Sequence, residues 1–398
     1  MGIELRPLGV SCNIACKYCY QNPQRDAGNA RKRYDMAAML SALEEEAQPF
    51  TLFGGEPLLV PIDDLERLWA FGLERFGFNR LQTNGTLIEP RHIELFGAYN
   101  VEVGISIDGP SSLNDARWVG SLERTRAATE RAQAAIGQLC AAGIVPKLII
   151  TLHRGNGSRS AWPRMDAWLL QLESLGITRA RLHVLEIDHL DVGQHLGMSD
   201  AENAEAFLHF YELERTTLTS LRFDVFEEIR KLLLGDDEDT GCVWHACDPY
   251  TTDAVHGIEG FGERSNCGRT NKLGIDFIKA GRPGYDRVLA LWRTPQKDGG
   301  CASCRFFAMC KGQCPGSAID SDWRNRSAQC PLWMTLFSRI EADLIAEGLS
   351  PLSLDSRRDA IEQSLLSAWS SGFNATLASI VAELDRAVDA GRAPCAPT

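Results

Sequence analysis

Long apolar runs are missing from this 398-residue sequence: none reaches the ~18 residues of a membrane-spanning helix, and the first residues lack the charged-then-apolar pattern of a signal peptide. Excess positive charge is missing too, because 41 lysines and arginines stand against 53 aspartates and glutamates, a formal net charge of −12. A duplex-binding protein needs a basic face to neutralise phosphates. We therefore expect a cytoplasmic protein that binds neither nucleic acid nor a membrane.

Cysteine is plentiful, with 13 residues. Cytosolic chains keep their thiols reduced, so metal ligation explains these cysteines better than disulfides do. Cys12, Cys16 and Cys19 form a C-x3-C-x2-C loop directly after an apolar, strand-like segment. A four-iron cube takes four thiolates, so three of them leave one iron open to an outside ligand. The alternative is a zinc knuckle, but that needs a fourth Cys or His within a few residues, and the next histidine is His92.

This cysteine loop resembles the signature of the radical S-adenosylmethionine (radical SAM) superfamily. The resemblance implies that SAM binds the open iron through its amino and carboxylate groups. It also implies that one electron from the cluster splits SAM to a 5′-deoxyadenosyl radical, with an external one-electron reductant of the flavodoxin or ferredoxin type. Tyr18, inside the loop, occupies the position of the aromatic residue that packs near the adenine in this family.

The fold is predicted from short apolar runs that alternate with amphipathic stretches from residue 3 to about residue 186, a pattern typical of βα units and a parallel sheet. We expect strands near 3–10, 50–54, 79–83, 101–107, 146–152 and 179–186, and helices near 35–47, 63–75, 89–97, 121–142 and 161–175. Six such units predict an α/β fold, a partial (β/α)6 TIM barrel, in which the chemistry gathers at the C-terminal ends of the strands.

Several of the predicted strands end in motifs that resemble the SAM site of the superfamily. Strand two ends in Gly54-Gly55-Glu56, the GGE motif, which by resemblance holds the SAM amino group. The resemblance further implies that cofactor or substrate lies beside the strand-end residues Asn84, Ser106 and Asp108, and that an arginine pairs with the SAM carboxylate, for which Arg117 and Arg124 are the two candidates. Turn formation alone would also explain the Asn-Gly and Asp-Gly pairs.

Beyond residue 241 the cysteine density rises, with eight cysteines in residues 242–330. The run Cys301-x2-Cys304-x5-Cys310-x3-Cys314, followed by Cys330, resembles the core of the SPASM domain, and Cys247 with Gly262-x4-Cys267 resembles its opening half. The resemblance implies two auxiliary four-iron clusters, so that the chain holds three [4Fe-4S] clusters in all. Their ligands would be Cys242, Cys247, Cys267 and Cys314 for one, and Cys301, Cys304, Cys310 and Cys330 for the other. Structural zinc at 301–314 is the alternative.

The chain is accordingly divided into three segments: a barrel over 1–234, a SPASM domain over 235–330 and a helical segment over 331–398. We expect a helix near 199–233, an exposed acidic boundary at 235–241, a helix near 331–347 and a helical tail near 355–391. Few long periodic segments fall within 242–330, so we expect metal ligation to replace an apolar core there. Cys140 and Cys395 are left without a predicted ligand role.

The resemblance implies a reaction class, since SPASM-type enzymes largely modify peptide or protein side chains. We predict an oxidative maturase that crosslinks a ribosomally made precursor peptide through a C–C, C–O or thioether bond, with the auxiliary clusters accepting the surplus electron. The alternatives are sulfatase-maturase-like oxidation of a protein side chain, modification of a small metabolite, and an iron–sulfur electron carrier that is not an enzyme. The first strand begins almost at Met1, so we expect another surface or a separate protein to bind a peptide leader.

The sequence offers several candidates for the catalytic base. Sulfatase maturases carry a catalytic Asp at the position of Gly268. The candidates for a base are Asp108, Asp248, Asp253 and Glu263, and the candidate substrate contacts are His153, Arg154, His183, Glu186 and Asp188.

Overall fold

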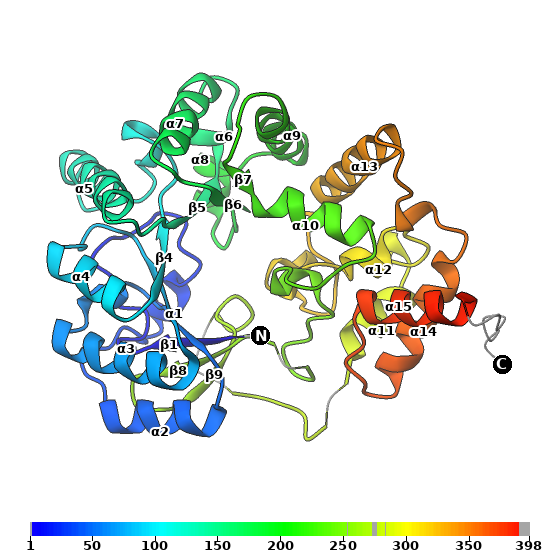
Figure 1. The fold of residues 1–398 in the computed structure, drawn as a ribbon, viewed down its shortest axis with the longest axis horizontal. Helices are drawn as coiled ribbons and strands as arrows, with labels where there is room; N and C mark the ends of the chain where they lie inside the picture. Colours follow the sequence, from blue (N-terminus) through cyan, green and yellow to red (C-terminus); the bar gives the residue numbers. More distant parts are fainter. Residues whose placement is uncertain (1, 253, 273–276, 283, 390–398) are drawn as a thin grey trace. The chain divides into compact units, whose positions relative to one another are not determined.

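Nine strands form one sheet in the order β7-β6-β5-β4-β3-β2-β1-β8-β9 (Figure 1). The computed structural model describes residues 2–252, 254–272, 277–282 and 284–389. The strands are β1 (Ile3–Arg6), β2 (Phe50–Leu52), β3 (Asn79–Thr83), β4 (Val101–Ser106), β5 (Lys147–Leu152), β6 (Arg179–Val184), β7 (Arg222–Phe223), β8 (His256–Glu259) and β9 (Arg264–Asn266). All neighbours pair in parallel except β8 and β9, which are antiparallel. Among the described residues β7 does not pair with β9, so the sheet is open, as predicted for a partial barrel.

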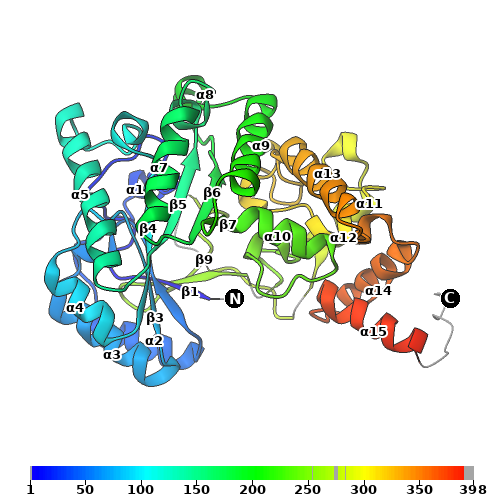
Figure 2. The same ribbon diagram turned by 45° about the horizontal axis from the view of Figure 1, so that its top comes forward.

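Helices lie along the outside of this sheet, where α2 to α5 and α7 follow one another in both views (Figure 2). The helices up to residue 216 are α1 (Asn22–Asp26), α2 (Met36–Glu46), α3 (Ile62–Phe76), α4 (Pro90–Ala98), α5 (Leu122–Ala141), α6 (Arg154–Gly157), α7 (Trp162–Ser174), α8 (Leu190–Leu196) and α9 (Asp200–Thr216). The core lies between the two layers, where strand residues such as Leu5, Leu52 and Ile105 and helix residues such as Leu68 and Ile136 are all buried. All six predicted strands and all five predicted helices of this region are confirmed, within a few residues at their ends.

The chain folds into two compact units whose boundaries differ from the predicted ones. The barrel unit comprises Gly2–Asp224 and also Val255–Phe277, which adds β8 and β9 to the sheet beside β1. The C-terminal unit comprises Val225–Ala254 and the residues from Ile278 onward. The predicted segments 1–234, 235–330 and 331–398 therefore do not coincide with the compact units. A parallel partner strand for β1 that comes 250 residues later cannot be read from local periodicity.

The C-terminal unit is helical. Its helices are α10 (Asp224–Leu233), α11 (Asp286–Arg293), α12 (Phe307–Cys310), α13 (Cys330–Ala346), α14 (Arg358–Ser370) and α15 (Leu377–Asp389). The helix expected near 331–347 is confirmed as α13. The one expected over 199–233 is instead α9, β7 and α10, and the tail is two helices separated by a turn at Gly372, whose φ is +78°. No helix among the described residues is long and apolar enough to cross a membrane.

Two expectations for the C-terminal unit were wrong. An apolar core does exist there, because Trp244, Phe306 and Phe337 are buried, with the Phe306 and Phe337 rings stacked at 5.1 Å between centroids. The acidic boundary is not fully exposed either, because Asp237 is buried in an ion pair with Lys311, with Oδ2 and Nζ 3.1 Å apart. Its carboxylate also accepts hydrogen bonds from the first amides of α15. The residues that form this core and this ion pair are distant from one another in the sequence, so composition reveals neither the core nor the pair.

Candidate functional site

The cysteine loop follows β1 and is held against the segment after β4. The amide of Ala15 donates to the carbonyl of Trp118 at 2.7 Å, and that of Lys17 donates to Ala116 at 2.9 Å. Cys16 is buried, while Cys12 and Cys19 are half-buried. Burial raises the pKa of the Cys16 thiol to about 12, and the neighbouring Cys19 and Cys12 raise it further while Arg117 opposes them. Such thiols bind as thiolates only where a metal stabilises the charge, so the loop suits a metal cluster.

The glycines after β2 allow the loop to approach the sheet. A Cβ at Gly55 would lie 1.9 Å from the carbonyl oxygen of Ser11, and one at Gly54, whose φ is +121°, would lie 2.4 Å from that of Gly9. The amide of Glu56 donates to Ser11 at 2.8 Å. The two glycines thus bring the end of β2 against the chain that leads to Cys12, a close approach that no residue with a side chain permits.

The Glu56 carboxylate is buried and joins two strand ends. It accepts hydrogen bonds from the amide of Leu58 at 3.0 Å, the hydroxyl of Thr83 at 2.7 Å and the amide of Asn84 at 2.8 Å. Burial raises the pKa of Glu56, and these hydrogen bonds oppose the shift. The predicted contact of Glu56 with the SAM amino group stays a prediction, since three acceptor positions of the carboxylate already serve the protein.

Asn84 lies beside the cysteine loop. Its side-chain amide donates to Asn13, which follows Cys12, at 2.8 Å, and its nitrogen lies 3.9 Å from the Cys12 sulfur. Ser106, at the end of β4, accepts a hydrogen bond from Gln82 of β3 at 2.8 Å. The structure therefore brings both predicted residues to the same edge of the sheet as the cysteines. Asn13 and Gln82 were missed, because a single amide in a loop or strand carries no motif.

Asp108 and Arg117 meet Tyr18 of the cysteine loop. The Tyr18 hydroxyl donates to the fully buried Asp108 carboxylate, and the Arg117 guanidinium donates to the Tyr18 oxygen at 3.1 Å. The other Asp108 oxygen accepts from the amide of Thr151 at 3.0 Å. Arg124 is exposed on α5, so the geometry favours Arg117 as the arginine of this site. The Asp108 carboxylate is a clamp for the loop, and its hydrogen bonds leave it poorly placed to be a base.

His153 faces the same network from the end of β5. The ring is buried, its Nδ1 accepts from the amide of Gly155 at 3.1 Å, and its Nε2 lies 3.8 Å from Oδ2 of Asp108. With Nδ1 as the acceptor, Nε2 carries the proton and points toward Asp108. Burial lowers the pKa of His153, which favours the neutral ring. Among the predicted substrate contacts, His153 is thus the one that joins the loop network.

The remaining predicted substrate contacts are engaged in ion pairs or lie elsewhere. Glu186 pairs with Arg269 at 2.6 Å and with Lys272 at 3.2 Å, and Lys272 also pairs with Asp188 at 2.5 Å. Arg154 is exposed and pairs with Glu202. These residues after β6 therefore anchor the segment that follows Cys267, a role that sequence patterns did not suggest.

His183 of β6 gives a pH prediction. Burial, together with Arg269 and Arg181, lowers the pKa of His183 to about 3. The unfolded chain takes up a proton near pH 6.5 that the folded chain does not, so stability falls as pH decreases from about 6.5 toward 3. Because His183 as a whole residue is only half-buried, we expect a loss of only about 1 kcal/mol between pH 6.5 and 5. In urea unfolding, His183→Asn should flatten this dependence and the exposed His195→Asn should not; equal slopes for all three proteins would refute it.

The other described candidate bases are held by contacts of their own. Asp248 is fully buried in the C-terminal unit, and its carboxylate accepts from the backbone amides of Tyr250, Thr251 and Arg287 at 2.9, 3.2 and 3.1 Å. Glu263 is exposed on the β8–β9 turn and pairs with Arg31 at 3.0 Å. Asp253 lies outside the described residues.

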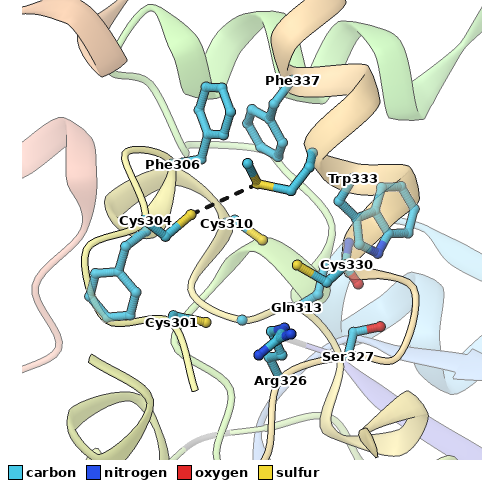
Figure 3. Close-up of a pocket in the computed structure, with 13 residues that line it drawn as sticks. Cys301, Cys304, Phe306, Cys310, Gln313, Arg326, Ser327, Cys330, Trp333 and Phe337 are labelled. Atoms are coloured by element: carbon cyan, nitrogen blue, oxygen red, sulfur yellow. Dashed lines mark hydrogen bonds between the residues drawn. The ribbon is translucent and has the colours of Figure 1, made fainter. Parts of the chain in front are cut away.

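Four cysteines of the C-terminal unit line one cavity (Figure 3). They are Cys301, Cys304, Cys310 and Cys330, and Phe306, Trp333 and Phe337 close the cavity around them. Burial, reinforced by the neighbouring thiols, raises the pKa of Cys301 to about 12 and that of Cys310 well above its usual range. Among the described residues no three His, Cys, Asp or Glu side chains are arranged to hold a single metal ion.

A second group of thiols lies in the same unit. The charges of Cys314 and Cys242 both raise the pKa of Cys247, in addition to its burial. Cys267, the fourth ligand predicted for this group, follows β9 in the barrel unit. Its ligand role stays a prediction. Cys140 is a half-buried residue of α5, and Cys395 lies outside the described residues.

Comparison with known proteins settles the class of the barrel. Residues 7–157 match the model of the Radical SAM superfamily. This part of the chain is a radical SAM domain. The matched residues include the cysteine loop, the Gly54-Gly55-Glu56 turn and the hydrogen-bonded pair Tyr18 and Asp108.

Individual relatives extend the comparison. A serine-type anaerobic sulfatase-maturating enzyme of Bacteroides thetaiotaomicron is 32% identical over 128 residues, 28% of this chain and 30% of that enzyme, so the chain matches only about a third of its length. An AdoMet-dependent heme synthase of Nitratidesulfovibrio vulgaris is 25% identical over 324 residues, 76% of this chain and 84% of that enzyme. The solved structure of native anSMEcpe with bound AdoMet and Cp18Cys peptide superimposes with a TM-score of 0.65 at 17% identity, over 87% of this chain and 98% of that one. This last likeness concerns the fold.

Proposed function

We propose that this protein oxidises a side chain of a short peptide by radical chemistry and closes a crosslink, with auxiliary clusters in the C-terminal unit accepting the surplus electron. The observation that carries the proposal is the cavity ringed by Cys301, Cys304, Cys310 and Cys330, in a chain that already has a radical SAM domain. An enzyme that only cleaves SAM needs no second site of this kind. A second redox-active site in the chain would suit a net oxidation.

The barrel residues would hold the reagent. Cys12, Cys16 and Cys19 would hold a [4Fe-4S] cluster and leave one iron for SAM, and the pair supplies reductive cleavage of SAM to a 5′-deoxyadenosyl radical when an external reductant delivers one electron. Tyr18 fixes the loop against Asp108, and Arg117 places a guanidinium there that matches a carboxylate in geometry.

The number of hydrogens and electrons that leave the peptide gives a reason for a second redox site. Joining two side-chain atoms breaks one C–H bond and a second C–H, O–H or S–H bond and forms one new bond, so two hydrogens leave the peptide. One leaves as a hydrogen atom to the deoxyadenosyl group. The other leaves as a proton and an electron, and iron–sulfur clusters held by the auxiliary cysteines would take that electron. Another surface or a separate protein would bind a peptide leader, and a cytoplasmic location remains part of this proposal.

Formylglycine formation is less well supported than crosslinking. Gly268 has no carboxylate, and a Cβ there would already lie 3.1 Å from the Arg6 guanidinium. The Asp248 carboxylate is held by three amides, and Glu263 is exposed in an ion pair. The contacts of these two carboxylates do not favour a catalytic base at either position.

A second candidate is oxidation of a small metabolite. The alignment with the heme synthase covers most of this chain, whereas that with the sulfatase-maturating enzyme covers 28% of it. An electron carrier that never cleaves SAM is the third candidate, from a different class. Two features argue against a carrier: the close approach of the Gly54-Gly55 turn to the cysteine loop, and the hydrogen bond of Arg117 to Tyr18. Electron transfer alone needs neither.

The test is anaerobic co-expression with short peptides encoded beside the gene, followed by mass spectrometry. Crosslinking predicts a peptide that has lost two hydrogens and, with a peptide deuterated at the reacting carbon, deuterium in 5′-deoxyadenosine. Deoxyadenosine without any change in a panel of peptides, but with turnover of a tetrapyrrole, would support the metabolite candidate instead. No deoxyadenosine from fully iron-loaded protein would support the carrier.

A further inference from the structure

Arg287 of α11 is a buried cation that has no carboxylate partner. Its side chain is 1% exposed, and among the described residues no carboxylate oxygen lies within 4 Å of its guanidinium. Burying an unpaired charge costs several kcal/mol, and a buried arginine cannot escape this cost by losing its proton. The residue must therefore have another source of negative potential.

Four backbone carbonyls supply part of that potential. The Arg287 guanidinium donates to Trp323 at 2.7 Å, Asn325 at 3.0 Å, Cys247 at 3.3 Å and Gly312 at 3.3 Å. All four hydrogen bonds reach segments that carry or flank predicted cluster ligands. Dipoles of neutral carbonyls satisfy the donors of a guanidinium but leave its net charge uncompensated.

The position of Arg287 lies between the two groups of thiols. Cys247 belongs to one group, and Gly312 separates Cys310 of the other group from Cys314. One turn further along α11, the carbonyl of Leu291 accepts from the amide of Cys301 at 2.7 Å. Helix α11 thus contacts the backbone of both thiol groups.

With clusters bound, the sulfurs of Cys247, Cys314 and Cys301 would be thiolates and would supply the missing negative charge. Burial lowers the pKa of Arg287, and the charges of Cys247, Cys314 and Cys301, followed by Asp248, oppose the shift. The Asp248 carboxylate itself is oriented toward the amide of Arg287. A four-iron cube closed by four thiolates carries net negative charge, and its reduction adds more. A fixed cation nearby stabilises the reduced state.

We propose that Arg287 is the shared counter-ion of both auxiliary iron–sulfur sites and raises the reduction potentials of both. The role rests on the proposed function, because it needs clusters at these thiols. Arg287 is a positioning residue: it touches neither substrate nor reacting atoms, and it makes the C-terminal unit a better electron acceptor. One cation that serves two sites predicts that both potentials move together.

The test uses the full chain with Cys12→Ala, Cys16→Ala and Cys19→Ala, so that only auxiliary signals remain, reconstituted without oxygen. Iron analysis comes first, with about eight irons expected for two cubes. EPR-monitored redox titration then compares this protein with added Arg287→Met, Arg287→Lys and, as the matched control, Arg293→Met at the exposed end of the same helix. We expect both midpoint potentials to become more negative in Arg287→Met, and to stay near the parent values in Arg287→Lys and Arg293→Met.

The outcomes separate the two proposals. Absence of iron from the parent protein would overturn the auxiliary clusters themselves. Loaded Arg287→Met with unchanged potentials, or with one potential shifted and the other not, would overturn the counter-ion role and leave the clusters standing. If Arg287→Met fails to bind iron, Arg287→Lys decides: full loading with parent potentials supports a role of the charge, and loss of iron there too assigns Arg287 a hydrogen-bonding role only.

Discussion

Cys16→Ala abolishes SAM cleavage and removes about four irons from the anaerobically reconstituted protein. Cys16 is the buried member of the N-terminal trio, and its loop is fixed by two backbone hydrogen bonds to the segment after β4. Two remaining thiolates cannot replace the third, so we expect 5′-deoxyadenosine formation to fall to the level of protein without iron, a loss of at least about 1,000-fold, or about 4 kcal/mol. The measurement is chromatography of 5′-deoxyadenosine after dithionite reduction, with iron analysis of the same sample.

The matched control for this prediction is Cys140→Ala. Cys140 is a half-buried thiol of α5 in the same unit, with no predicted ligand role. It should keep its iron and its rate within about twofold. Retained cleavage in Cys16→Ala, or equal loss in both variants, would show that the loop is not the cluster site.

Lys311→Met destabilises the C-terminal unit by about 3–5 kcal/mol, the usual cost of leaving one member of a buried ion pair uncompensated. Lys311 and Asp237 are each 1% exposed, and the Lys311 ammonium also donates to the carbonyl of Trp244 at 2.9 Å. Asp237 in turn accepts from the amides of Leu377 and Ala378, so the same pair fixes the start of α15. Burial alone would raise the pKa of Asp237, but Lys311 and these amides outweigh it and lower that pKa.

The measurement is guanidinium unfolding followed by tryptophan fluorescence, which reports on both units and includes the buried Trp244, Trp333 and Trp369 of the C-terminal unit. The exposed Lys297→Met is the control, and we expect it to lie within about 0.5 kcal/mol of the parent protein. Hydrogen exchange at α15 should also accelerate in Lys311→Met alone. A change below about 1 kcal/mol in Lys311→Met would mean that the pair does not stabilise the unit as its burial implies.

Features of the site whose residues are close together along the chain could be predicted from the sequence. The loop of Cys12, Cys16 and Cys19 and the Gly54-Gly55 turn are local patterns, and their reason is visible in the structure: the glycines let the two segments touch. Strand and helix periodicity similarly predicted the barrel up to β6, because each unit buries its own alternating face. The radical SAM class followed from these local features.

Features that depend on distant partners were not predictable. Strand β8 joins the sheet beside β1, Asp237 meets Lys311 across 74 positions, and Asp248 holds the start of α11 rather than serving as a base. The sequence alone does not show whether an isolated carboxylate or arginine is solvated or buried. Arg287 is the clearest case, since only burial and its four carbonyl partners distinguish it from the exposed Arg293 on the same helix.

The central claim is that the loop of Cys12, Cys16 and Cys19 holds a cluster with one iron left for SAM. Its most direct measurement is EPR of the reduced full chain in which the auxiliary cysteines Cys301, Cys304 and Cys310 and also Cys242, Cys247 and Cys314 are replaced by alanine, before and after SAM is added. The account predicts one four-iron signal that changes on SAM addition and decays as 5′-deoxyadenosine forms. A four-iron signal that SAM leaves unchanged, without 5′-deoxyadenosine, would contradict it.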